Sequence, residues 1–146
     1  MEVINRIRKI FYPDLYSKEV APENGMKLCL VARRRIGRYC LAVFEYDKDQ
    51  PVELQVKDAR TCIRKATRSY WLFRELGAYI VFVSSEPIKG ISSEHLSVDT
   101  TGFHAVILQG VHIIAPNTQI YNHSKWSNHT FGGAKVIAGK LSAVQT

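Results

Sequence analysis

Seven of the arginines fall into two groups whose spacing suits contact with phosphate. Four lie within six residues of one another: Arg33, Arg34, Arg35 and Arg38. Three more recur every four residues: Arg60, Arg64 and Arg68. Guanidinium groups match phosphate oxygens in a planar fork, and an i, i+4 spacing places side chains on one side of a helix. Both groups therefore predict contact with a polyanion, although each also fits an ordinary solvated turn or helix face.

A second set of side chains could assist phosphodiester cleavage if they share one face of a sheet. The candidate catalytic residues are Glu45, Glu53, Gln55 and Lys57. Carboxylate oxygens are the ligands that Mg²⁺ prefers, so Glu45 and Glu53 are the candidate metal ligands. A lysine beside them would place a positive charge near the attacked phosphate. The alternative interpretation is a sheet with alternating charged residues and no catalysis.

Histidine and cysteine give weaker indications. His104 and His112 fall in predicted strands and are interpreted as structural. His123 and His129 share the aromatic-rich loop 121–133, which leaves a metal or small-ligand site open as a prediction. The three cysteines are Cys29, Cys40 and Cys62. With no C-x-x-C pair among them, we expect reduced core thiols and no structural zinc.

The elements that must position these residues begin with a helix and a hairpin. Apolar residues at helical spacing predict an amphipathic helix over Glu2–Phe11, ended by the proline that follows. Its apolar stripe fits the core better than a membrane surface. Strands are predicted over Met26–Ala32 and Tyr39–Tyr46. A short link that contains glycine makes them a hairpin with the first arginine group at its tip.

The stretch from residue 51 to residue 84 predicts a crossover unit. Pro51–Lys57 alternates apolar and polar residues with a period of two, as a half-buried strand does. Asp58–Leu76 changes to a helical period and predicts a long amphipathic helix. Ala78–Val83 is a continuous apolar run typical of a buried strand. A strand, a helix and a second strand in this order form a parallel pair.

The remainder of the chain completes a single mixed α/β domain over residues 1–146. Further strands are predicted at 103–108 and 111–115, and residues 136–144 fit a last strand or a short helix. The predicted architecture is a central mixed sheet with helix and strand order αβββαββ. We expect the tail from 116 to 146 to pack on this sheet or to extend it.

This order of elements resembles the restriction-endonuclease-like, or PD-(D/E)xK, nuclease superfamily. In that superfamily a Glu-x-Lys or Gln-x-Lys strand precedes the long helix. Gln55-Val56-Lys57 stands in that position, with Asp58-Ala59-Arg60 after it, and the resemblance covers roughly residues 2–115. It implies Mg²⁺-dependent cleavage of nucleic acid. The chain departs from the superfamily at the preceding strand, where Tyr39–Val43 contains none of the expected aspartate.

Charge favours the same class of partner. The net charge is +7, and no Asp or Glu follows Asp99. A basic surface attracts polyanions, so we expect a protein that binds DNA or RNA, with catalysis left open. Charged residues interrupt the first apolar run and no stretch reaches membrane-spanning length, which predicts a cytoplasmic protein without a membrane partner. The alternatives are a protein-binding accessory module, which could be a homodimer, and a small-molecule site in the His/Trp loop.

Overall fold

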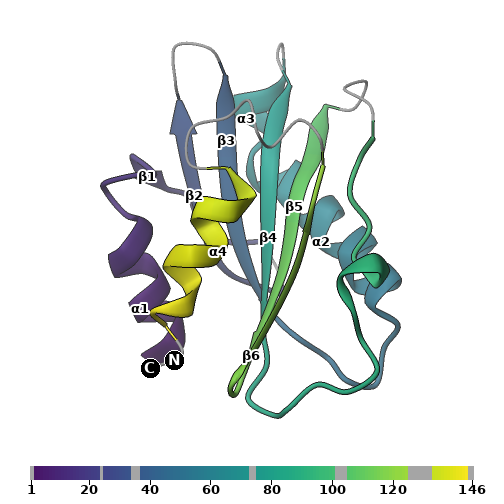
Figure 1. Ribbon diagram of the computed structural model, residues 1–146. Coiled ribbons are helices and arrows are strands. Elements are labelled where there is room, and N and C mark those ends of the chain that lie inside the picture. Colours follow the sequence, from purple (N-terminus) through teal and green to yellow (C-terminus); the bar gives the residue numbers. More distant parts are fainter. Residues whose placement is uncertain are drawn as a thin grey trace.

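A six-stranded sheet forms the centre of the computed structural model, which describes residues 2–23, 25–33, 37–72, 75–100, 105–124 and 133–144 (Figure 1). Its strands lie side by side in chain order: β1 (Lys18–Glu19), β2 (Met26–Arg33), β3 (Arg38–Glu45), β4 (Leu76–Val83), β5 (Val106–Ala115) and β6 (Thr118–His123). β3, β4 and β5 run parallel, and the other neighbouring pairs are antiparallel. The predicted class, a mixed sheet with an N-terminal helix, is confirmed.

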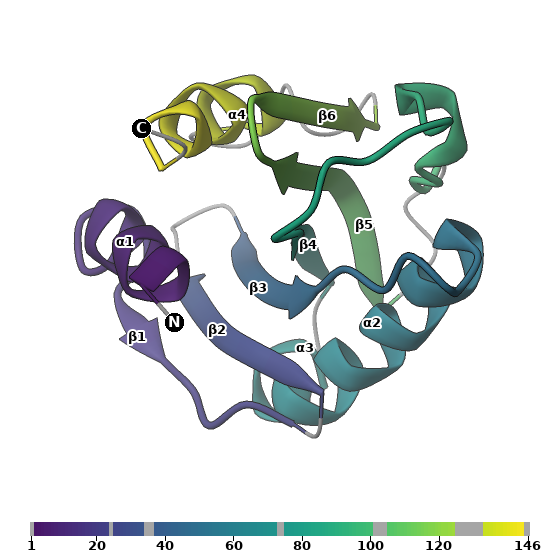
Figure 2. The same ribbon diagram turned by 90° about the horizontal axis from the view of Figure 1, so that it is seen from below.

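Helices cover both faces of this sheet, as the end-on view shows (Figure 2). The helical elements are α1 (Glu2–Phe11), α2 (Val52–Ala66), α3 (Arg68–Trp71), the 3-10 helix η1 (Ser93–His95) and α4 (Ala134–Ser142). α2 packs on one face, where Val56 and Ile63 are buried. α1 and α4 share the other face, where Ile7 and Leu141 are fully buried.

The N-terminal helix and the hairpin have the predicted positions. α1 spans the predicted residues, and its buried Ile7 and Phe11 are four residues apart on one side of the helix. β2 and β3 pair antiparallel, with Arg33 opposite Arg38 at the end of the hairpin. The long buried runs of these strands follow from the helices on both sides of the sheet.

The prediction of a strand over Pro51–Lys57 is wrong, because this segment opens α2. The buried positions include Val52, Val56, Ala59 and Ile63, which follow a helical spacing. Leu54, which alternation would bury together with Val52 and Val56, is 45% exposed. The helical segment also ends earlier than predicted, with α2 stopping at Ala66 and β4 beginning at Leu76.

The second half of the chain differs from the prediction in two places and decides a third that the prediction left open. The two strands expected around Gln109-Gly110 form one long strand, β5, whose register against β4 shifts between Ala78 and Tyr79. The first residues of the predicted loop 121–133 belong to β6, which begins at Thr118 and extends the sheet. The segment left open as strand or helix is the helix α4, which packs beside α1.

Candidate nucleic-acid interface

Tyr70 in α3 brings together cations from three strands. The guanidinium carbon of Arg33, the last residue of β2, lies 5.0 Å from the centre of the Tyr70 ring. The ammonium nitrogen of Lys18 in β1 lies 5.9 Å from the same centre. Arg38, the first residue of β3, donates a 3.0 Å hydrogen bond to the Tyr70 backbone carbonyl. The end of the hairpin therefore lies against α3.

Trp71 continues this cluster onto α2. The guanidinium carbon of Arg64 lies 5.7 Å from the centre of the Trp71 ring. The indole N–H of Trp71 donates a 2.8 Å hydrogen bond to the Arg64 backbone carbonyl. Tyr70 is buried and Trp71 is half-buried, and a cation over such a ring contributes about 0.5–2 kcal/mol, so these contacts orient the cations without neutralising them. Arg64 of α2 and the two hairpin arginines therefore contact neighbouring residues of α3.

We call this cluster the basic surface. Its cations are Lys18, Arg33, Arg38, Arg64 and Arg68, and its rings are Tyr70 and Trp71. Four of the five cations are exposed and Arg38 is half-buried. Within the described ranges, none of the five forms an ion pair with a carboxylate. Their charge is consequently available to a partner at the end of the sheet where β3 and β4 begin.

Arg60 does not belong to this surface, although its spacing places it on the helix ridge. Its guanidinium forms an ion pair with Asp99, and its side chain is only 24% exposed. The same Asp99 carboxylate accepts a 2.8 Å hydrogen bond from the backbone N–H of Leu108 in β5. Arg60 therefore joins α2 to the sheet. Arg34 and Arg35, also predicted to contact phosphate, lie outside the described residues.

Gln55 has a structural position rather than the predicted strand position. It is 7% exposed, and its amide holds the connection between β3 and α2. Its nitrogen donates to the carbonyls of Asp47 and Gln50 at 2.8 and 3.0 Å. Its oxygen accepts from the backbone N–H of Asp47 at 2.9 Å. Both hydrogen-bonding groups of this amide are thus used within the fold.

The other three candidate catalytic residues do not share a face with Gln55. Glu53 and Lys57 are exposed on α2, whereas Glu45 ends β3 and lies 3.9 Å from the ammonium of Lys27. These four residues were expected on one strand face, but Glu45 lies on β3 and the other three lie on α2. A catalytic role for this set stays a prediction.

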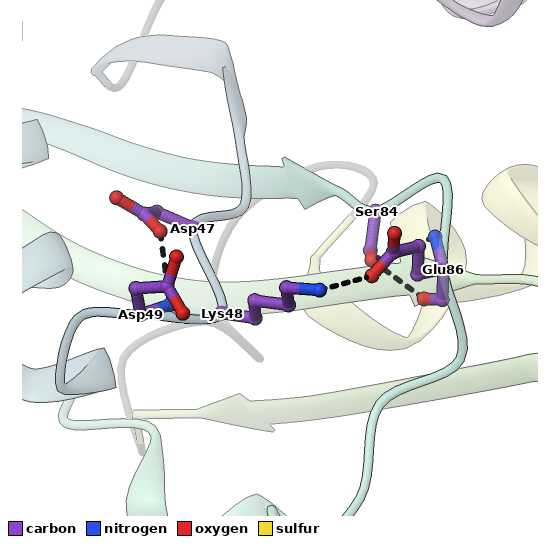
Figure 3. Close-up of polar contacts among 5 residues, drawn as sticks. All are labelled: Asp47, Lys48, Asp49, Ser84 and Glu86. Carbon is purple, nitrogen blue, oxygen red and sulfur yellow. Dashed lines mark hydrogen bonds and ion pairs between the residues drawn. The ribbon is translucent and has the colours of Figure 1, made fainter.

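A polar hollow of about 450 Å³ does lie where β3 and β4 end. Lys48 and Glu86 bridge its two loops with a 2.9 Å ion pair, and Asp47, Asp49 and Ser84 line it as well (Figure 3). Across the described ranges, no three His, Cys, Asp or Glu side chains gather closely enough to hold a metal ion. The Mg²⁺-dependent cleavage that the nuclease resemblance implies stays a prediction.

The histidine predictions can be followed only in part. His112 is fully buried in β5 and stacks on Tyr121 of β6, with ring centres 5.4 Å apart. Burial, and secondarily the charge of His123, lowers the pKa of His112 to about 3. His104, His129 and Trp126 lie outside the described residues, and so does most of the predicted ligand loop.

Two members of the basic surface, Lys18 and Tyr70, were not identified from the sequence as binding residues. Tyr70 follows the apolar helical pattern, and it is indeed buried. Its ring and carbonyl serve as an anchor for cations that are far away in the chain. The close pairing of Arg33 and Arg38 across the hairpin was the one available signal, because it fixes both arginines at the same end of the sheet.

Comparison with protein-family models, with curated proteins and with solved structures found no match for this chain. Within the described ranges, no helix has both the length and the apolar character needed to cross a membrane. Evidence for a function therefore comes from the geometry of the chain itself.

Proposed function

We propose that this protein binds nucleic acid through the basic surface. The observation that carries the proposal is the position of Tyr70 and Trp71, which hold hairpin arginines on one side and a helix arginine on the other. Cations from two distant segments thereby contact two neighbouring residues of α3. A phosphate backbone is the polyanion whose repeated charges suit such a row.

The chemistry of the surface favours the backbone over any base sequence. Exposed guanidinium groups form bidentate hydrogen bonds with phosphate oxygens, and they remain charged at every physiological pH. Contacts of this kind position a nucleic acid and contribute most of its non-specific affinity. Phosphodiester cleavage is not included in the proposal, since Glu45 ends β3 whereas Glu53, Gln55 and Lys57 lie on α2, where Gln55 is buried.

The test uses a double variant, Arg64→Ala with Arg68→Ala, in a binding titration against a labelled oligonucleotide. A matched control, Lys89→Ala with Lys135→Ala, removes the same charge from exposed positions outside the basic surface. We expect the first variant to bind at least about tenfold more weakly at moderate salt. The slope of log affinity against log salt should fall by about two, one for each lost phosphate contact.

The control should retain the wild-type salt slope, because its lysines contact no phosphate in this proposal. Thermal unfolding of all three proteins would show that the substitutions leave the fold intact. Equal weakening in both variants would mean that only net charge matters, and the basic surface would then have no special role. Absence of binding by the wild type at low salt would reject the proposed function altogether.

A further inference from the structure

An apolar groove lies at the carboxyl ends of the parallel strands, at the other end of the sheet from the basic surface. It consists of two adjoining hollows of about 290 Å³ each, which share Val3, Val83, Ser84 and Ser85. Each hollow alone is close to the lower limit of about 300 Å³ for sites that hold small organic ligands. The two together therefore have room for a short apolar chain or a ring.

The groove follows from the way the chain leaves the sheet. The connections after β3 and β4 lead to α2 and to Leu96, which pack on the α2 face. On the opposite face the groove is bordered by the first turn of α1, the ends of β4 and β5 and the segment after α4, through Val3, Val83, Ile114 and Val144. Val3 and Val83 are only half-buried, although they belong to the apolar cluster of α1 and α4. A ligand that covers them removes apolar surface from water, which is favourable.

The polar hollow at this end of the sheet adjoins the groove. Val83, Ser84 and Ser85 line both the groove and this hollow of about 450 Å³. Four carboxylates and one ammonium group are found among the residues that line the polar hollow: Glu45, Asp47, Asp49, Glu86 and Lys48. An apolar space and an acidic space therefore meet at the two serines.

The acidic charge beside the groove is only partly neutralised. Lys48 pairs with Glu86, but the two side chains are 68% and 62% exposed, and ion pairs that exposed are weak. Within the described ranges, Asp47 and Asp49 form no ion pair. Their loop contains a 2.9 Å hydrogen bond from the Asp49 backbone N–H to the Asp47 carboxylate (Figure 3). The loop thus presents two negative charges in a chain whose net charge is +7.

The cations that border the groove are already paired. Arg6 lies 2.7 Å from Glu2, and its guanidinium also donates a 3.2 Å hydrogen bond to the Val144 carbonyl. Lys27 lies 3.9 Å from Glu45. Among the described residues of the groove, an anionic ligand would therefore meet no unpaired cation. Charge complementarity favours a positively charged ligand.

We propose that the groove and the polar hollow together bind a small organic cation, a primary amine that carries an apolar chain or ring. The apolar part covers Val3 and Val83, and the ammonium group donates hydrogen bonds to Asp47 and Asp49. Hydrogen bonds between charged groups are roughly twice as strong as neutral ones. Small-molecule sites commonly combine an apolar wall with a few polar groups that fix the orientation of the ligand. This activity does not depend on the proposed function, because the two sites lie at opposite ends of the sheet.

Three probes that share a chain and differ in charge test the site: n-octylamine, n-octanol and octanoate. Each is titrated into the whole protein at neutral pH while backbone amide signals are recorded by NMR. We expect saturable shifts at Val83, Ser84 and Ser85, with n-octylamine bound at least about tenfold more tightly than octanoate. n-Butylamine should bind at least about tenfold more weakly than n-octylamine, because its shorter chain covers less of the groove.

Variants with a matched control locate the ligand. Asp47→Asn with Asp49→Asn keeps an oxygen for the hydrogen bond within the loop, and it should weaken n-octylamine at least about fivefold while leaving n-octanol unchanged. Asp14→Asn with Asp58→Asn removes the same charge from exposed positions outside the groove and the polar hollow. This control should bind both probes as the wild type does. Ser85→Phe fills the exposed position where the hollows meet and should abolish binding of every probe.

The possible outcomes decide the proposal and keep it separate from the proposed function. Octanoate or n-octanol bound as tightly as n-octylamine would overturn it, because the carboxylates would then have no role. Unchanged n-octylamine affinity in the Asp47→Asn, Asp49→Asn variant would also overturn it. So would a wild-type dimer in sedimentation that Ser85→Phe converts to a monomer, because a second copy of the chain would then occupy the groove. Failure of oligonucleotides to bind would reject the basic surface alone.

Discussion

At the scale of single residues, the fold uses polar side chains for purposes that their types alone do not reveal. Gln55 and Arg60 both matched a functional pattern, yet each is turned inward and joins two elements. Arg64, one turn after Arg60, contacts Trp71 and stays exposed. Spacing alone placed both arginines on the same helix ridge. It could not distinguish them, because the difference is the position of Asp99 in space.

His112 provides a prediction at this scale. Its ring nitrogens have no hydrogen-bond partner among the described residues, and burial lowers its pKa to about 3, so the folded protein keeps it neutral. In the unfolded chain the pKa returns to about 6.5. The unfolded state therefore binds the proton first as the pH falls. His112 should cost about 1.4 kcal/mol of stability per pH unit between pH 6.5 and about pH 3.

The measurement is urea unfolding of the wild type and His112→Leu at several pH values between 7.5 and 4. As the pH falls, the free energy of unfolding should decrease more steeply for the wild type than for the variant. The difference in slope should reach about 1.4 kcal/mol per pH unit, which corresponds to one proton bound on unfolding. Above pH 7.5 the His112 contribution should be constant, since the imidazole is neutral in both states. Identical pH profiles for the two proteins would show that His112 does not remain neutral in the folded state.

At the scale of elements, most of the assignments could be made from periodicity, and the errors have identifiable causes. The spacing of apolar residues predicted α1, β2, β3 and β4 with nearly the observed bounds. Val52 and Val56 satisfy both a strand period and a helix period, and the packing of α2 against the sheet decides between them. β6 was missed because its residues are all half-buried and the polar surroundings resemble a loop.

Gln55 provides a prediction at the element scale. α2 begins after Pro51 without a side-chain cap, and the Gln55 amide instead holds the preceding loop through three hydrogen bonds. Gln55→Leu should leave the Asp47 and Gln50 backbone groups unpaired and destabilise the protein by about 2 kcal/mol. Urea unfolding measures the loss. Lys57→Leu, an exposed substitution on the same helix, should change stability by less than about 0.5 kcal/mol. Equal effects of both would contradict this role.

At the scale of the whole molecule, the predicted order αβββαββ describes the chain from α1 to β5 when the short helices α3 and η1 are left aside, but one of the three strands before α2 is a different segment. Three strands still precede α2, because β1 is present and the segment 51–57, wrongly predicted as a strand, is not one. The meeting of the hairpin end with α3 could not be predicted, because Arg38 and Tyr70 are 32 residues apart and no local pattern links them.

This arrangement gives the sheet two chemically different ends. The end where β3 and β4 begin carries the basic surface, and the end where they finish carries Asp47, Asp49 and Glu86. A polyanion should be attracted to the first end and repelled from the second. The polarity of the molecule therefore predicts not only that nucleic acid binds, but also which end it occupies.

The most direct test of this central claim is an NMR titration of the wild-type protein with a short single-stranded oligonucleotide. Shifts should concentrate at Lys18, Arg33, Arg38, Arg64 and Arg68 and at the two aromatic residues of α3. They should weaken as salt is added, while Asp49 and Glu86 at the opposite end stay unchanged. Shifts confined to that opposite end, or to α1 and α4, would contradict the account.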